Sequence, residues 1–104
     1  MEAARSYQKD LIEDLKDPRE AIGYLNAALE DGNKQVFLLA LRNVIEAYGG
    51  MTKISRASKL HRVSLYKMLS KKGNPGIHSL MTLLNAIGFQ ILISANNSKL
   101  RKAA

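Results

Sequence analysis

Helix-breaking residues recur at short intervals along this chain, so it can form only a series of short helices. The Asp-Pro pair at 17–18 predicts a helix start, because aspartate caps a first turn and proline suits the first helical position. Glycine at 32 and the Gly-Gly pair at 49–50 predict helix ends, since glycine readily adopts the left-handed conformation that follows a last turn. The run Gly-Asn-Pro-Gly at 73–76 is a further break. We therefore expect a mostly α fold with five helices between residues 17 and 95.

Apolar side chains recur within these segments at the three- and four-residue spacing of an amphipathic helix. In the helix that begins after residue 17 they are Ile22, Leu25 and Leu29. In the helix that Asn33 can cap they are Phe37, Leu41, Val44, Ile45 and Tyr48. After the break at 73–76 they are Ile77, Leu80, Met81, Leu84 and Ile87. A chain of 104 residues has room for one core, so we expect these stripes to meet in a single compact domain over residues 17–95.

Two shorter helices are predicted in the middle of the chain, over Met51–Ser58 and Arg62–Lys71. The connection from Ser58 to His61 allows only a tight turn between them. Two short helices joined by a tight turn are typical of a helix-turn-helix, here over about residues 51–71.

The segment Phe89–Ser94 differs in composition from the helices. It is rich in β-branched and aromatic residues and is bounded by glycine and asparagine, which predicts a short C-terminal β-strand. A lone strand cannot satisfy its own backbone hydrogen bonds, so we expect this strand to pair across a homodimer. The predicted dimerisation residues are Phe89, Ile91 and Ile93.

Both ends of the chain are expected to lie outside the domain. Residues 1–16 have a weak apolar stripe, which is typical of a flexible segment or of one that orders on a partner. That stripe consists of Tyr7, Leu11, Ile12 and Leu15. Residues 96–104 form a basic tail with little to bury, for which a solvated, mobile state is favoured over contact with DNA. The bases of the tail are Lys99, Arg101 and Lys102.

Charge is divided unevenly along the chain. The formal net charge is +7, but residues 1–46 hold all nine acids and six bases, whereas residues 47–104 hold ten bases and no acid. A basic segment without interspersed acids attracts polyanions. A run of bases is more often a solvated face, but here the bases coincide with the predicted helix-turn-helix, and this coincidence favours DNA binding.

Catalytic and metal sites have little support in the sequence. The chain has no cysteine, and no acid lies near either of its two histidines, His61 and His78, so neither a metal site nor a nucleophile with its base is indicated. We therefore expect a protein that is not an enzyme and uses no metal or cofactor. The longest apolar run, Val36–Leu41, is far too short to span a membrane, and the N-terminus has no apolar signal core. A small cytoplasmic protein with no membrane partner is the resulting expectation.

The second helix of the predicted helix-turn-helix has a core side and a free side. Leu65, Met68 and Leu69 form the core side, so the opposite face can enter the major groove of double-stranded DNA. The predicted base-reading residues on that face are Arg62, Val63, Ser64 and Lys67, which offer a guanidinium, a methyl-bearing side chain, a hydroxyl and an ammonium. The predicted DNA backbone contacts are Thr52, Lys53, Arg56, Tyr66, Lys71 and Lys72. For Tyr66, packing at the edge of the core is an equal alternative.

Several segments resemble one protein family. After the Asp-Pro pair at 17–18 come Tyr-Leu-Asn-Ala-Ala-Leu at 24–29 and Phe-Leu-Leu-Ala-Leu at 37–41. Later come Ser-Leu-Tyr-Lys-Met-Leu-Ser at 64–70, Gly-Asn-Pro at 73–75 and Leu-Leu-Asn-Ala-Ile-Gly at 83–88. Together these segments resemble the addiction-module antidote proteins, HigA-like antitoxins of bacterial type II toxin–antitoxin modules. The resemblance covers about residues 17–93.

This resemblance implies a five-helix, lambda-repressor-like helix-turn-helix domain. It also implies a homodimer that neutralises a RelE/ParE-type toxin encoded beside it and represses its own operon. Three positions depart from the family pattern. In the turn, Lys59 replaces the usual glycine, and at the start of the next helix His61 replaces the usual serine. After asparagine–proline, Gly76 replaces the usual threonine. A left-handed lysine at 59 would cost roughly 1 kcal/mol, and histidine is a poorer cap than serine.

The leading hypothesis is a sequence-specific DNA-binding antitoxin whose acidic first half faces a basic toxin. Two-fold symmetry would set the two recognition helices about 34 Å apart on an inverted-repeat operator. One alternative is a prophage-type helix-turn-helix regulator without a toxin partner. Another, of a different class, is a helical protein-interaction module with a basic face. A toxin-like reading frame beside the gene would favour the antitoxin, whereas salt-dependent DNA binding without sequence preference would favour the interaction module.

Overall fold

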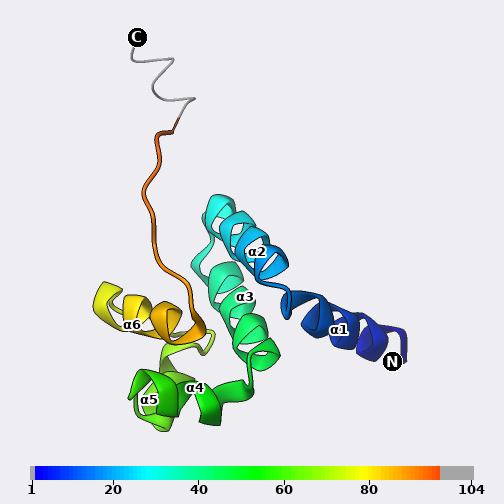
Figure 1. Ribbon diagram of the computed structural model, residues 1–104, viewed down its shortest axis with the longest axis horizontal. Helices are drawn as coiled ribbons and strands as arrows, with labels where there is room; N and C mark the ends of the chain where they lie inside the picture. Colours follow the sequence, from blue (N-terminus) through cyan, green and yellow to red (C-terminus); the bar gives the residue numbers. More distant parts are fainter. Residues whose placement is uncertain (1, 97–104) are drawn as a thin grey trace.

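The structure, a computed structural model, describes residues 2–96, with side chains from Ser6 onward, and its described part contains six helices and no strand (Figure 1). In chain order the helices are α1 (Glu2–Leu15), α2 (Pro18–Asp31), α3 (Lys34–Ala47), α4 (Gly50–Ser58), α5 (Arg62–Met68) and α6 (Ile77–Ile87). The mostly α prediction is confirmed. The expected number of five helices is wrong, because residues 2–15, expected outside the helical domain, form α1.

The expected C-terminal β-strand is also wrong. Residues 89–96 run as an extended segment, and no described residue pairs with them in a ladder. The first residue of the segment contacts the helical core. The Phe89 amide donates to the Leu84 carbonyl of α6 at 2.8 Å, and the Phe89 ring packs edge-on against Tyr48 at the end of α3. A composition rich in β-branched residues favours extended backbone, but a strand forms only where a second strand accepts its hydrogen bonds.

The helix ends follow the local signals in the sequence. The Asp17 carboxylate caps α2 by accepting from the Arg19 amide at 3.0 Å, and Gly32 ends this helix with a φ of 77°. The Asn33 side chain accepts from the amides of Gln35 and Val36 and so caps α3. Each side chain satisfies backbone donors that a helix start would otherwise expose. The predicted caps at Asp17 and Asn33 and the predicted end at Gly32 are confirmed.

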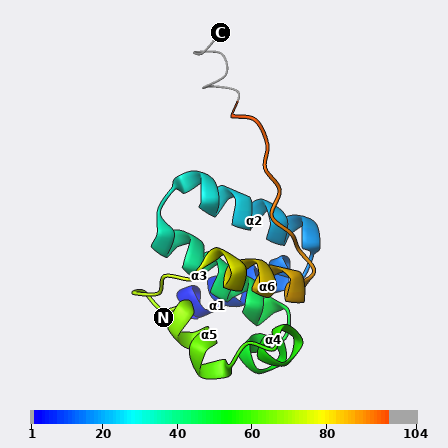
Figure 2. The ribbon, with the colours of Figure 1, turned by 90° about the vertical axis from the view of Figure 1, so that its left-hand side faces the viewer.

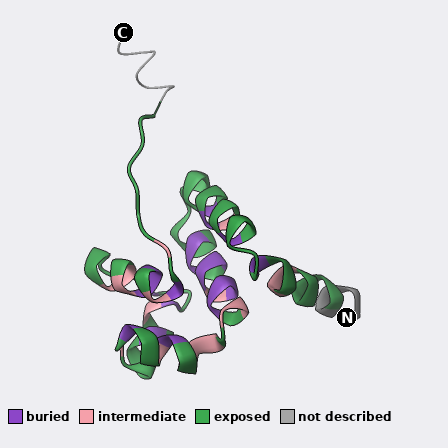
Figure 3. Cartoon of the chain, in the orientation of Figure 1, coloured by how far each residue is buried: buried purple, intermediate pink, exposed green. Residues whose placement is uncertain are grey.

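Helix α3 lies at the centre of the fold. Its Leu38, Leu41, Val44 and Ile45 side chains are almost wholly buried, and Figure 3 shows this helix as the most buried element. Helices α1 and α2 pack on it from one side and α4 from the other, while α6 packs on α4 (Figures 1 and 2). Burial on two sides explains why α3 is apolar over most of its surface.

Helix α1 is attached to this core by an apolar anchor and a polar network. The Leu15 side chain is buried, and Leu11 packs against the core next to it. The Gln8 amide donates to the Asn43 side-chain oxygen at 3.0 Å, and the Asn43 amide donates to the Tyr24 hydroxyl at 2.9 Å. One buried asparagine of α3 therefore links α1 and α2, and buried polar groups that are satisfied in this way fix one arrangement of neighbouring helices.

Some side chains expected in the core are exposed. Ile22 and Leu29 of α2 and Met81 of α6 are each about half exposed, although they continue the apolar stripes of their helices. Their neighbours Leu25 and Leu84 are buried. The described part of the chain therefore buries only part of the apolar stripes of α2 and α6.

Candidate nucleic-acid interface

Helices α4 and α5 are joined by a turn that side chains hold in place. The Ser55 hydroxyl donates to the Leu60 carbonyl at 2.6 Å, and the Leu60 amide donates to the Ser58 hydroxyl at 3.2 Å. Lys59, between them, has a φ of 61° and is the one non-glycine residue with a positive φ in the described part of the chain. The expected left-handed lysine is confirmed. His61, expected to be a poorer cap than serine, precedes α5 and makes no side-chain capping hydrogen bond. The two serines hold the turn at a conformation that lysine disfavours.

Helix α5 presents one face to the core and the other to solvent. Leu65 and the following Leu69 are completely buried, and Met68 packs beside them. The opposite side exposes the four predicted base-reading residues, Arg62, Val63, Ser64 and Lys67. Val63 is two-thirds exposed, which is unusual for a residue with no polar atoms in its side chain. The structure therefore brings the four predicted residues together on one accessible helix face.

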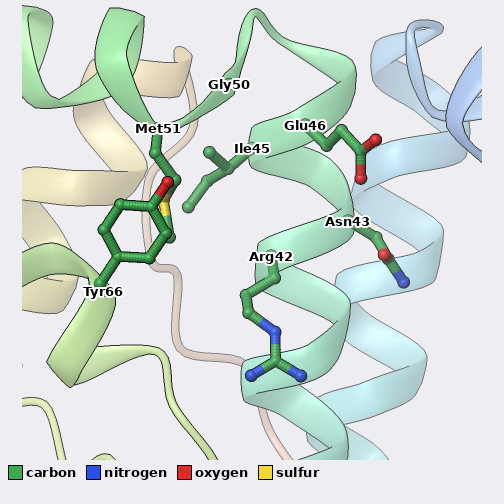
Figure 4. Close-up of a pocket in the computed structure, with 7 residues that line it drawn as sticks. All are labelled: Arg42, Asn43, Ile45, Glu46, Gly50, Met51 and Tyr66. Carbon is green, nitrogen blue, oxygen red and sulfur yellow. The ribbon is translucent and has the colours of Figure 1, made fainter.

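Tyr66 lies at the edge of this face and has two contacts. The Arg62 guanidinium lies 5.7 Å from the centre of its ring, within the range of a cation–π interaction. The ring also lines a hollow of about 330 Å³ between α3 and α4, where Figure 4 shows it beside Met51. Half of the Tyr66 side chain remains exposed, so it both packs against its neighbours and can reach an outside partner.

The predicted backbone-contacting residues flank this face. Thr52, Lys53 and Arg56 are exposed on α4. Lys71 and Lys72 are exposed in the turn after α5, which ends at Met68 and not at Lys71 as expected.

Two residues of α3 hold the end of α5 and were not predicted. The Arg42 guanidinium donates to the Leu69 carbonyl at 2.6 Å, and the Gln35 side-chain amide donates to the Lys71 carbonyl at 3.3 Å. They satisfy carbonyl groups of the turn that follows α5. No local pattern could have indicated them, because their partners lie 27 and 36 residues further along the chain.

The turn after α5 also requires its glycine. Gly73 is buried, its amide donates to the Ser70 carbonyl at 2.8 Å, and a side chain at this position would collide with the backbone of Met68. Residues 69–73 are therefore packed closely against the end of α5. Their backbone determines the positions of Lys71 and Lys72 relative to α5.

The bases of the interface lie in a half of the chain that has no acidic residue. Residues 47–104 contain no acid, so no carboxylate of this half can pair with the bases of α4 and α5. An ion pair occurs at the end of α1, where the Lys16 ammonium after the helix lies 2.8 Å from the Glu13 carboxylate and its hydrogen bond lowers the pKa of that carboxyl. Among the described residues no group of three or more histidine, cysteine or acidic side chains could hold a metal ion.

The predicted dimerisation residues differ in their surroundings. Phe89 packs on the chain's own core, whereas Ile91 is 43% exposed and Ile93 is 98% exposed. The predicted basic tail, with Lys99, Arg101 and Lys102, lies outside the described residues apart from its first residue, Asn96.

Comparison with known proteins identifies the family. Residues 6–95 match the sequence model of a family described as probable addiction module antidote protein. The chain belongs to this family. It is also 33% identical over 84 residues to an uncharacterized protein of Haemophilus influenzae, and the match covers 81% of this chain and 86% of that relative. No solved structure matches the chain.

Membership of the antidote family assigns the chain an antitoxin role in a toxin–antitoxin pair, with a toxin as partner. Antidote proteins generally act by binding and not by catalysis. No helix among the described residues has the length and apolar character needed to cross a membrane.

Proposed function

We propose that this antidote protein is a sequence-specific DNA-binding antitoxin that neutralises a RelE/ParE-type toxin and represses its own operon as a homodimer. The observation that carries the DNA-binding part is the exposed face of α5, which follows α4 after a short turn and lies in a half of the chain without acids. Such a face attracts the phosphate backbone and presents side chains to base edges.

In the proposed complex α5 lies in the major groove. Arg62 donates two hydrogen bonds to one guanine, and its contact with the Tyr66 ring limits the number of rotamers it must lose on binding. Val63 contacts a thymine methyl group, and Ser64 and Lys67 donate to base edges or to nearby phosphates. The sequence preference resides in these side chains.

The proposed phosphate contacts come from two sides of α5. Thr52, Lys53 and Arg56 of α4 contact the backbone on one side, and Lys71 and Lys72 contact it on the other. Gln35 and Arg42 act indirectly, because they hold the carbonyl groups of residues 69 and 71. In the homodimer, two recognition helices about 34 Å apart would read an inverted repeat.

The toxin is proposed to bind the acidic half of the chain. Asp10 and Asp14 of α1 and Glu20, Glu30 and Asp31 of α2 are exposed, so their carboxylates are available to a partner. A basic, ribonuclease-type toxin would be attracted to this surface, and charge complementarity of this kind raises the association rate.

The test is co-expression with the product of the neighbouring gene, followed by co-purification and a promoter-shift assay. We expect a stable complex and a shift of the chain's own promoter DNA. Failure to co-purify would contradict the antitoxin claim. If the promoter shift persisted without a complex, the chain would be a transcriptional regulator without a toxin partner.

A further inference from the structure

The turn between α4 and α5 contains a lysine in a conformation that lysine disfavours. Lys59 has a φ of 61° and a ψ of 15°, which lies in the left-handed region. A left-handed conformation crowds the Cβ atom, which glycine lacks, so glycine would fit this position without strain. The fold therefore requires a left-handed residue at this point of the turn, but it does not require a lysine.

The side chain of Lys59 does not hold the turn. The two hydrogen bonds that do so run from the Ser55 hydroxyl to the Leu60 carbonyl and from the Leu60 amide to the Ser58 hydroxyl. The Lys59 side chain is exposed and makes no hydrogen bond or ion pair with any residue that the structure describes. Its ammonium is therefore available to a partner outside the chain.

The dipole of α4 gives this ammonium one interaction within the chain. Lys59 follows the last residue of α4, and a cation at the end of a helix interacts favourably with the last carbonyl groups. Arg56 already supplies a positive charge in the last turn of α4, and such effects are small at exposed sites and screened by salt. Residues held in a disfavoured backbone conformation cluster at sites that bind ligands, so the strain at Lys59 points to a binding role.

The surroundings of Lys59 favour an anionic partner. The residue lies three positions after Arg56 and three before Arg62, in a half of the chain that contains no acid. A lysine ammonium offers three donors on a compact charge and binds phosphate groups as a point charge. A phosphate group is therefore the ligand that fits this position.

Lys59 is also close enough to α5 to reach DNA that binds this helix. Arg62 begins α5, and the Cα atoms of Lys59 and Arg62 lie at most about 11 Å apart, because three residues of chain join them. The major groove is about 12 Å wide and is bordered by phosphates on both sides. DNA that receives α5 in its major groove therefore brings phosphates within reach of the turn that precedes this helix.

We propose that the Lys59 ammonium binds a DNA phosphate beside the start of α5, and that this contact retains a lysine at a left-handed position. The hydrogen bonds of Ser55 and Ser58 fix the backbone of the turn, so Lys59 is held next to α5 before DNA binds. Pre-organisation of this kind strengthens binding. The inference rests on the proposed DNA binding and adds a residue that raises affinity while it lowers stability.

The experiment measures the DNA affinity and the thermal stability of the full chain in Lys59→Gly and Lys59→Gln. Both variants remove the charge, but only glycine also removes the strain. Affinity is measured over a range of salt concentrations, for the chain's own promoter duplex and for a shuffled duplex. We expect both variants to lose about 5–10-fold in affinity for both duplexes at about 0.1 M salt and to reduce the salt slope by about one. Lys59→Gly should nevertheless melt at a higher temperature than the wild type, whereas Lys59→Gln should not.

Two further variants are the controls. Lys9→Gln removes the same charge from an exposed position on α1 and should leave the affinity and the salt slope unchanged. Lys59→Arg keeps the charge in the turn and should bind both duplexes like the wild type.

Three results would overturn the inference. Wild-type affinity in Lys59→Gln, with weaker binding in Lys71→Ala, would show that Lys59 is only solvated or acts on the α4 dipole, and would leave the proposed DNA binding intact. An equal loss of affinity in Lys9→Gln would reduce the effect to net charge. A wild type that binds neither duplex would overturn the proposed DNA binding together with this contact.

Discussion

Replacing Lys59 by glycine should stabilise the protein, although it removes a side chain from an exposed turn. Lys59 has a φ of 61° and a ψ of 15°, and a left-handed residue with a Cβ atom costs roughly 1–2 kcal/mol. Glycine removes this cost but gains backbone freedom in the unfolded state, which offsets about 0.4–1 kcal/mol. The expected net gain is about 0.5–1 kcal/mol, or a melting temperature higher by about 2–8 °C.

The matched control is Lys53→Gly, which makes the same chemical change inside α4. There the backbone is helical, so glycine relieves no strain and should cost about 1 kcal/mol. Thermal and urea unfolding, followed by circular dichroism, would measure the stability of both variants. A gain of stability in Lys59→Gly together with a loss in Lys53→Gly would support strain at Lys59. Equal losses of stability in both variants would show that the turn at Lys59 holds no strain.

Three further predictions concern packing and pH. Gly73→Ala should lower the free energy of unfolding by about 2–3 kcal/mol, because the added methyl group collides with the Met68 backbone, and an unchanged urea midpoint would contradict this. Tyr48→Phe should raise stability by about 0.5–1 kcal/mol, because the buried hydroxyl has no hydrogen-bond partner among the described residues. Burial raises the pKa of Tyr48 above its ordinary value of 10.0, so the folded state holds this proton more tightly and the wild type should lose stability as the pH rises above about 10. The phenylalanine variant should lose less stability over the same pH range. A steeper loss of stability at alkaline pH in the variant would contradict this prediction. Asn43→Leu should leave Gln8 and Tyr24 without their shared partner and speed proteolytic cleavage before residue 17, whereas a wild-type cleavage rate would show that the network does not hold α1.

Local chemistry made most helix boundaries predictable. Asp17 and Asn33 cap helices because their side chains satisfy backbone amides within three residues, and Gly32 ends one because of its own backbone freedom. The accessible face of α5 was predictable for a similar reason: the burial of Leu65 and Leu69 determines which side of a short helix faces outward. The left-handed Lys59 was expected only from the family resemblance, in which this position of the turn has glycine.

Features that depend on distant partners were not predictable. The segment after Gly88 has a strand composition, but β-propensity describes a fit to a neighbouring strand, and no described residue supplies one. Helix α1 has a short stripe that is weak in isolation, and its order comes from Leu15 and from the Gln8 contact with α3. The bond from Arg42 to the carbonyl at the end of α5 joins residues far apart in sequence.

The central claim is that α5 reads DNA sequence, and the most direct test is the affinity of Arg62→Ala for two duplexes. One duplex carries the chain's own promoter and the other a shuffled sequence of equal composition. We expect Arg62→Ala to lose about 5–150-fold in affinity for the promoter, from about 1–3 kcal/mol for one base contact, and to change little in affinity for the shuffled duplex. Lys71→Ala, the control, should weaken binding to both duplexes alike and reduce the salt slope by about one. Equal losses of Arg62→Ala on both duplexes, or a wild type without preference for the promoter, would contradict the claim.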